Sequence, residues 1–89
     1  MFEYDLNKSK LNKAKHGIDF ITAEKLWEDP DRIEIPARWV DEQRFLLIAW
    51  HDSELWSAVF TLRKNKIRII SVRKSRKYEK EIYDSFRIR

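Results

Sequence analysis

Eight basic residues and no acidic residue lie between Arg63 and Lys77 of this 89-residue chain. They are Arg63, Lys64, Lys66, Arg68, Arg73, Lys74, Arg76 and Lys77. A run of isoleucine and valine is interleaved with them and is typical of a buried strand, so the charges belong to a rigid element rather than to a flexible tail. Guanidinium groups held in fixed positions can bind the phosphates of a polyanion such as RNA.

Arg68 and Arg73 are the first candidates for chemistry on a phosphodiester, because an arginine stays charged and can bond two phosphate oxygens at once. Cleavage of RNA without a metal uses the ribose 2′-OH as nucleophile and needs a base, an acid and cations near the developing phosphorane. The two arginines are five residues apart, so on a regular strand they point to opposite faces. Either a bulge or the end of the strand turns Arg73 round, or only one of them belongs to the site. The alternative role of each is a structural ion pair, for instance of Arg73 or Arg76 with Glu79.

Four residues could move protons, namely His16, Lys15, Glu79 and Tyr83. Histidine is the side chain that most readily changes its charge near neutral pH, and His16 ends a predicted helix, where the helix dipole favours a positive charge. It could instead bond the last carbonyl groups of that helix. Glu79 and Tyr83 are neighbours at positions i and i+4 of the last predicted helix. Glu79 could instead hold an arginine in place, and Tyr83 could be a half-buried core residue.

Further basic and aromatic side chains are expected to contact the RNA. These are Lys8, Arg63, Lys66, Lys74, Arg76, Lys77 and Trp50. Trp50 could stack on a base, or it could line the interface with a protein partner. Packing under helices is favoured instead for Trp39 and Trp56.

The charges are segregated along the chain. The net charge is +4, from 19 basic and 15 acidic residues, yet residues 24–54 hold nine acids and only four bases. A second basic stretch without acids runs from Lys8 to His16. We therefore expect one positive face and one ordinary face.

The composition predicts one compact, cytoplasmic domain that spans residues 1–89. Hydrophobic residues make up 43% of the chain, with one glycine and two prolines, which is typical of a globular core. Cysteine is absent, which excludes a disulfide framework, a thiolate nucleophile and a Cys-based zinc site. With only two histidines, far apart, we expect no metal and no cofactor. No segment has the length of a membrane span, and the N-terminus lacks the pattern of a signal peptide.

The N-terminal third predicts two helices. Asp5 can cap a helix that runs to about His16, and Gly17, the only glycine, fits the left-handed position that ends such a helix. Asp19 can cap a second helix, which Pro30 stops. The apolar stripe of this second helix consists of Phe20, Ala23 and Trp27.

From about Arg32 the pattern alternates, which predicts four strands joined by short turns. The predicted strands cover residues 32–39, 44–51, 56–63 and 66–73. Pro36 lies within the first, which places that strand at an edge of the sheet. The second is apolar on both faces, as an interior strand would be.

A final helix is predicted after Ser75, which can cap it. Its apolar stripe consists of Tyr78, Ile82 and Phe86. A short first strand can be added at residues 2–4. The fold class is therefore α+β, with two N-terminal helices, a mainly antiparallel sheet of four to five strands and a C-terminal helix. We expect the helices on one face of the sheet, and the function on the other, less covered face.

Two segments of the chain resemble the signatures of the BrnT toxin family. The N-terminal match consists of Tyr4-Asp5, Lys8, Asn12, Lys15-His16-Gly17, Phe20, Ala23 and Asp29-Pro30. The C-terminal match consists of Arg68-Ile69-Ile70-Ser71-Val72-Arg73, Glu79 and Tyr83, and Arg44 fits the arginine that opens a strand in the family. The chain departs from the family at Tyr4, where tryptophan is usual, and at Val72, where alanine is usual.

The resemblance implies a RelE-like ribonuclease fold and the toxin of a bacterial type II toxin–antitoxin pair. It implies RNA cleavage that halts translation, and a BrnA-like antitoxin with a ribbon-helix-helix DNA-binding part. The operator DNA would then be bound only through the toxin–antitoxin complex.

Two other functions are compatible with the residues. The same fold could belong to a toxin that poisons a protein target without catalysis, because a fold does not fix a function. The basic segments alone could also belong to a nucleic-acid-binding module without turnover.

Overall fold

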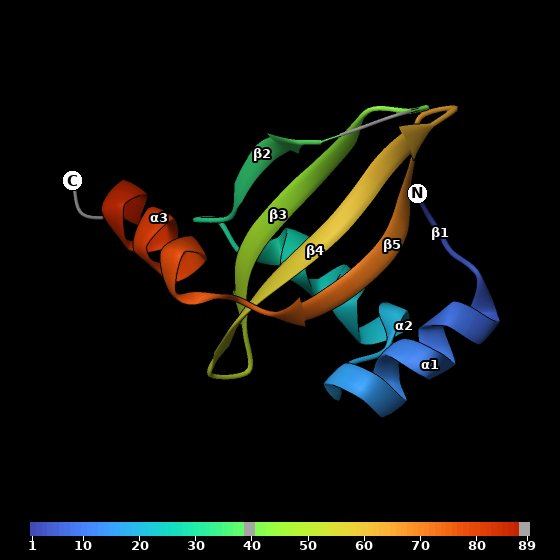
Figure 1. Ribbon diagram of the computed structural model, residues 1–89, viewed down its shortest axis with the longest axis horizontal. Coiled ribbons are helices and arrows are strands. Elements are labelled where there is room, and N and C mark those ends of the chain that lie inside the picture. The colour runs from blue at the N-terminus through green and yellow to red at the C-terminus, as the bar shows by residue number, and fades with distance from the viewer. Residues whose placement is uncertain (39–40, 88–89) are drawn as a thin grey trace.

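The computed structural model describes residues 1–38 and 41–87, and Trp39 lies outside them. One five-stranded sheet carries short helices at both ends of the chain (Figure 1). In chain order the elements are β1 (Phe2–Glu3), α1 (Leu6–His16), α2 (Phe20–Ala23), the 3-10 helix η1 (Glu24–Glu28), β2 (Ile33–Ala37), β3 (Arg44–His51), β4 (Glu54–Arg63), β5 (Lys66–Lys74) and α3 (Lys77–Arg87). The predicted α+β class is confirmed. No helix among the described residues is long and apolar enough to cross a membrane.

The strand order is β1-β5-β4-β3-β2, which confirms β2 at an edge and β3 in the interior. The hairpins make β2 to β5 antiparallel, whereas β1 pairs in parallel with β5. Both hairpins between β3 and β5 use two-residue turns whose residues have positive φ, at Asp52-Ser53 and Lys64-Asn65. Such turns match the twist of the strands that they join.

The predicted caps position the first two helices. Asp5 accepts a hydrogen bond from the backbone N–H of Lys8, and Asp19 accepts one from that of Thr22. Gly17 has a φ of 81° and ends α1 in the left-handed conformation. The second helix is shorter than its apolar pattern predicts, because it tightens into η1 after four residues.

Asn12 of α1 supplies hydrogen-bond partners for the backbone of β5 at the edge of the sheet, where the short β1 no longer pairs with it. Its buried side-chain amide donates to the carbonyl of Val72 at 2.9 Å and accepts from the N–H of the same residue at 3.2 Å. It also donates to the carbonyl of Ile18 at 2.7 Å. An amide side chain thus pairs with backbone groups that would otherwise be left unpaired in the interior.

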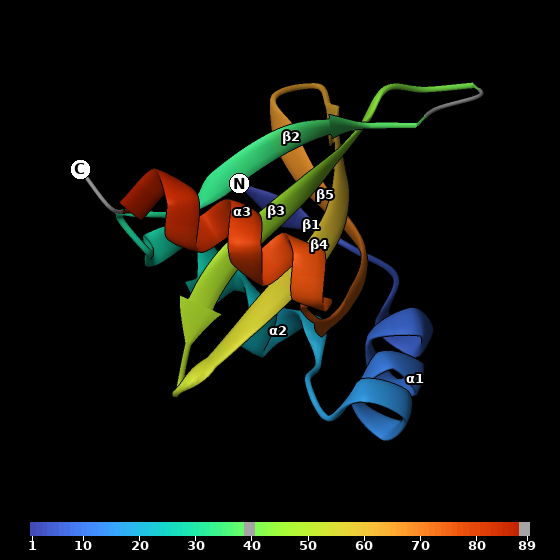
Figure 2. The same ribbon diagram turned by 60° about the vertical axis from the view of Figure 1, so that its left-hand side comes forward.

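The helices lie on both faces of the sheet, so the expectation of helices on one face is wrong. One core cluster packs Phe20 and Leu26 of the N-terminal helices against Leu47, Phe60 and other residues of one sheet face. The other cluster packs Tyr83 of α3 against Ile48 and Leu55 on the opposite face. Figures 1 and 2 show α3 on the side of the sheet away from α2. The two faces are called the α1–α2 face and the α3 face below.

The predicted apolar stripe of α3 is confirmed only at Ile82, which packs against the second core cluster. Tyr78 and Phe86 are about half exposed, whereas the two buried residues of the helix are Glu79 and Tyr83. Ser75 does not cap the helix, because its hydroxyl is hydrogen-bonded to that of Ser57. The carboxylate of Glu79 instead accepts from the N–H of Arg76 at 2.8 Å, the capping contact expected of a glutamate at the third helical position.

Candidate nucleic-acid site on the sheet

A bulge in β5 places Arg68 and Arg73 on the same face of the sheet. Val59 of β4 is paired with Ser71, but the next residue, Phe60, is paired with Ile69, so Ile70 is an extra residue in β5. Without it, the odd spacing of the two arginines would send them to opposite faces. The bulge is one of the two ways in which the sequence allowed both arginines to face the same side.

The register aligns a row of polar and charged residues across three neighbouring strands. Arg44 of β3 is opposite Thr61 of β4, and Thr61 is opposite Arg68 of β5. Glu3 of β1 is opposite Arg68 and extends the row to the edge of the sheet. Residues opposite one another in a sheet share a face, so this row lies on the α3 face together with Arg73.

The C-terminal helix covers only half of the α3 face. It packs over the end of the sheet that holds Ile48, Leu55 and Ser57. The other end, which we call the open half, carries no helix. The open half consists of Arg44, Leu46, Val59, Thr61, Arg68 and Ser71. Within it Thr61 is buried and donates to the carbonyl of Gln43, and Leu46 borders the core cluster under α3.

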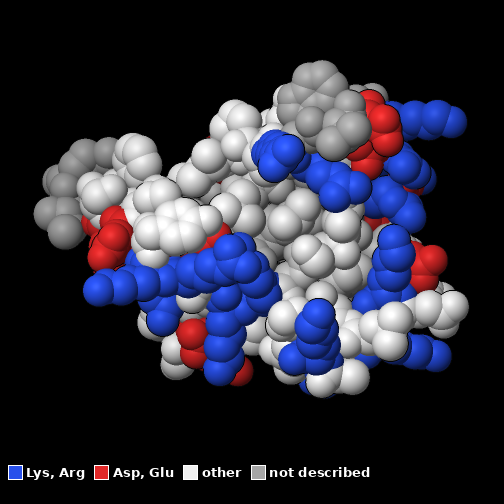
Figure 3. Space-filling model, viewed as in Figure 1, with Lys and Arg blue, Asp and Glu red and all other residues white. Residues whose placement is uncertain are grey.

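The space-filling view shows how charge is distributed over this side of the molecule (Figure 3). Lysine and arginine gather over α3 and around the ends of the strands, and the uncharged surface between them is set back. A concave, uncharged floor with a cationic rim can hold a nucleic-acid strand by its phosphates. This side of the molecule thus combines a hollowed surface with surrounding basic side chains.

Arg73 is held rigidly at the covered end of this face. Its guanidinium group donates to both carboxylate oxygens of Glu79, at 2.8 and 2.9 Å. Glu79 is fully buried and also accepts from the hydroxyl of Ser57 at 2.8 Å. The alternative of a structural ion pair between Arg73 and Glu79 is therefore confirmed.

Arg68 is held loosely by comparison. It makes one contact with Glu3, at 3.3 Å, and the side chains of both residues are about 30% exposed. Glu3 also lines an open hollow of about 430 Å³ with Arg63, Lys64 and Lys66. Arg68 therefore lies beside an accessible cationic hollow, where a phosphate could replace its single carboxylate contact.

Glu79 and Tyr83 are poorly suited to proton transfer near neutral pH. The hydrogen bonds from Arg73, Arg76 and Ser57 outweigh the effect of burial and lower the pKa of Glu79 to about 2. Burial and a 2.7 Å hydrogen bond to Asp29 raise the pKa of Tyr83 well above its usual value. Each side chain keeps one protonation state at neutral pH and holds α3 in place.

The candidates on α1 lie on a separate element. Lys8 is in its first turn, and Asp5, the cap of that turn, is close enough to Arg68 for the arginine to help lower its pKa. Lys15 and His16 are at the other end, about 10 to 12 Å further along the helix axis at 1.5 Å per residue. No hydrogen bond or ion pair within residues 1–38 and 41–87 joins these two side chains to Arg68 or Arg73.

The remaining candidates divide between the two sides of α3. Arg63 and Lys66 are paired at the end of the β4–β5 hairpin, beside the open half. Three other basic residues are exposed around the start of α3, namely Lys74, Arg76 and Lys77. Trp50 is 51% exposed but lies beyond α3, where it lines a different hollow with Glu28, Asp29 and Asp52.

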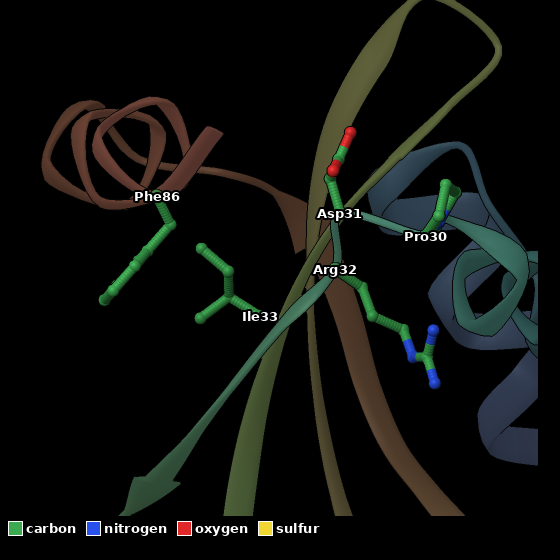
Figure 4. Close-up of a pocket in the computed structure, with 5 residues that line it drawn as sticks. All are labelled: Pro30, Asp31, Arg32, Ile33 and Phe86. Atoms are coloured by element: carbon green, nitrogen blue, oxygen red, sulfur yellow. The ribbon is translucent and has the colours of Figure 1, made fainter. Parts of the chain in front are cut away.

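A further hollow, of about 290 Å³, lies between α3 and the start of β2 (Figure 4). Phe86 and Ile33 extend into the space between the two elements, whereas Arg32 points to the other side of the chain. Its lining includes the acidic Asp31, and the side chain of Arg32 points away from the space, so this hollow does not offer a phosphate the contacts that the open half offers.

Arg44 and Glu3 are not among the residues predicted for the site, yet the register places both in the row with Arg68. Arg44 is 19 residues from the basic stretch, and Glu3 precedes the first helix. The charge pattern alone could not reveal them, because strand pairing brings them to Arg68. The match of Arg44 to a strand-opening arginine was the one available signal.

Comparison with known proteins gives one match. A family model described as "Ribonuclease toxin, BrnT, of type II toxin-antitoxin system" matches residues 4–79. A comparison with curated proteins found no match.

Proposed function

Because the chain belongs to the BrnT family of ribonuclease toxins of type II toxin–antitoxin systems, we propose that it cleaves RNA on the open half of the α3 face without a metal ion. The family has RNA as its substrate and an antitoxin as its partner. The alignment of Arg44, Thr61 and Arg68 in one row beside the cationic hollow is the observation that supports this location.

In this proposal Arg68 and Arg44 bind one phosphodiester from the two strands on either side of β4. Arg44 has only a 3.9 Å contact with Glu42, and its side chain is 45% exposed. Exposed pairs of this kind are weak, so an incoming phosphate can displace the carboxylates. In the proposed reaction the two guanidinium groups stabilise the charge that develops on the phosphorane.

Glu3 is the carboxylate best placed to act as general base. It is about 30% exposed and lies 3.3 Å from Arg68, so a ribose bound beside that arginine would bring its 2′-OH close. The 2′-oxygen, once deprotonated, attacks phosphorus, and the bond from phosphorus to the 5′-oxygen breaks. The products are a 2′,3′-cyclic phosphate and a 5′-OH, whose proton comes from solvent or from the ammonium group of Lys66.

The other predicted site residues have different places in this proposal. Arg63 and Lys66 bind phosphates at the hairpin end, and Arg76 and Lys77 bind them at the start of α3. Arg73 and Glu79 shape the covered end of the face and do not move protons. We retain the BrnA-like ribbon-helix-helix antitoxin and a cytoplasmic location as expectations from the family.

The test is an RNA cleavage assay with the purified protein in EDTA. We expect products with 2′,3′-cyclic phosphate ends and a loss of about 100-fold in rate for Arg68→Ala and for Glu3→Gln. The control is Arg87→Ala, which removes an arginine on α3 that also pairs with one carboxylate, that of Asp31 at 3.7 Å, and whose side chain is 51% exposed against 29% for Arg68. This variant should cleave at the rate of the unmodified protein.

Two outcomes would refute the proposal. Activity that disappears in EDTA and returns with a divalent cation would rule out the metal-free mechanism. Growth arrest with intact cellular RNA would indicate instead a toxin that binds a protein target.

A further inference from the structure

An apolar groove lies on the α1–α2 face, on the opposite side of the sheet from the open half. Its volume is about 390 Å³. The side chains that form most of its lining are Phe2, Trp27, Phe45, Phe60, Leu62 and Ile67. The N-terminal helices cover the rest of this face and end at Glu28, directly after Trp27, so the groove is the part of the face that they leave open.

The floor of the groove is a rigid set of packed aromatic rings. The ring of Trp27 meets those of Phe2 and Phe60 edge-on, with centroids 5.1 and 5.2 Å apart. Phe45 stacks on Phe60 at 5.3 Å. These side chains are already ordered before anything binds, so little of their conformational entropy is lost when a segment docks on them.

The groove meets the cationic hollow at the end of the sheet. Leu62 faces the groove and the next residue, Arg63, faces the hollow. The same alternation holds for Ile67 with Lys66 and for Phe2 with Glu3. A single segment that crosses this end of the sheet can therefore place an apolar side chain in the groove and an acidic side chain in the hollow.

We propose that the groove and the adjoining hollow are the docking site of the antitoxin, through a segment with an apolar anchor and a neighbouring Asp or Glu. This inference rests on the proposed function in one respect, because it takes the open half as the RNA site. Three cations against one carboxylate in the hollow make it complementary to an acidic partner. An acidic side chain bound there lies next to Glu3 and Arg68 and competes with an RNA phosphate, which accounts for neutralisation of the toxin.

The binding test uses the cognate antitoxin, identified as the protein whose co-expression restores growth. Leu62→Glu places a charge in the groove at a side chain that is 57% exposed, so the fold should tolerate it. We expect antitoxin affinity to fall by roughly 30-fold or more, as for the loss of a central apolar anchor. The matched control is Leu11→Glu on α1, a leucine that is 69% exposed, and its affinity should be unchanged.

A second variant tests the charged part of the site. Lys64→Glu should weaken antitoxin binding at low salt, and its effect should shrink at high salt because the interaction is screened. The effect of Leu62→Glu should persist at both salt concentrations. Circular dichroism of the variants verifies that each is folded.

Cleavage assays on the same variants separate this inference from the proposed function. Without antitoxin, Leu62→Glu should cleave RNA at the unmodified rate. Absence of cleavage by the unmodified protein would refute the proposed function, while the binding data would still decide the docking site.

Three results would overturn the docking site. One is a Leu62→Glu variant that binds the antitoxin as tightly as the unmodified protein. Another is a variant that loses RNA cleavage and keeps its antitoxin affinity, which would make RNA the occupant of the groove. The third is a toxin dimer in sedimentation that Leu62→Glu dissociates, which would make a second copy the occupant.

Discussion

The covered and open halves of the α3 face hold their arginines in opposite ways. Under α3, Arg73 makes two short hydrogen bonds to a carboxylate that solvent does not reach. In the open half, Arg68 makes one longer contact to a carboxylate that solvent does reach. Both arginines belong to β5 and to the same face, so residue type and strand do not distinguish them. The helix above one of them does, because it decides whether an incoming phosphate can compete for the guanidinium group.

The largest effect is expected from removing the buried carboxylate. Glu79→Ala leaves Arg73 with an unpaired charge beneath α3 and should lower the free energy of unfolding by about 3 to 5 kcal/mol. Urea denaturation measures this change. If Glu3→Ala destabilises the protein as much as Glu79→Ala, the contrast between the two halves is incorrect.

A slightly smaller loss of unfolding free energy is expected at acidic pH. The pKa of Glu79 is about 2 in the folded protein, against 4.5 for the unperturbed group, so its ionised form stabilises the fold above pH 4.5. That contribution, about 3 kcal/mol, should be lost as the pH falls from 4.5 towards 2. Asp29, whose pKa is lowered mainly by the N–H of Trp50 and the hydroxyl of Tyr83 against the effect of burial, acts in the same direction.

The measurement is the unfolding free energy as a function of pH for the unmodified protein and for Glu79→Gln. The variant cannot ionise at this position, so its stability should change less between pH 4.5 and 2. If the two stability curves ran parallel over this pH range, protonation of Glu79 could not be the cause of the loss of stability.

An intermediate effect is expected from the contact that fixes the middle of α3. Tyr83→Phe removes the hydroxyl that donates to Asp29 at 2.7 Å and keeps the ring in the core. Stability should fall by about 1 to 2 kcal/mol, because the partly buried carboxylate of Asp29 loses one of its donors. Thermal melting measures the loss, and Tyr78→Phe, at an exposed tyrosine of the same helix, should leave the melting temperature unchanged.

The smallest change in stability is expected in the open half. Arg68→Ala and Arg44→Ala each remove an ion pair that solvent reaches on both sides and should alter the free energy of unfolding by less than about 1 kcal/mol. The same two variants should be impaired in RNA cleavage. Stable but inactive variants would sharpen the contrast with Glu79→Ala, whereas unfolded ones would show that these arginines are structural as well.

Much of the local structure could be predicted because it depends on neighbouring residues. Asp5, Gly17 and Asp19 act within their own helix turns, and Pro36 excludes β2 from the interior through its missing N–H. The alternation in β4 predicts which of its residues face the larger core, and Phe60 is buried there. The burial of Glu79 could not be predicted from the apolar pattern of the last helix, because a helix normally presents apolar residues to the sheet.

The sequence by itself determined the caps of the two N-terminal helices, the succession of antiparallel strands, the cationic content of β5 and the family of the chain. Only the tertiary structure decided that Ile70 is bulged, that α3 crosses to the face opposite α1 and α2, and that Arg44 and Glu3 join Arg68. The physical reason is the range of the interactions. A cap or an alternation is set by residues a few positions apart, whereas the carboxylate that pairs with a guanidinium group, and the burial of that carboxylate, are set by whichever distant segment packs beside it.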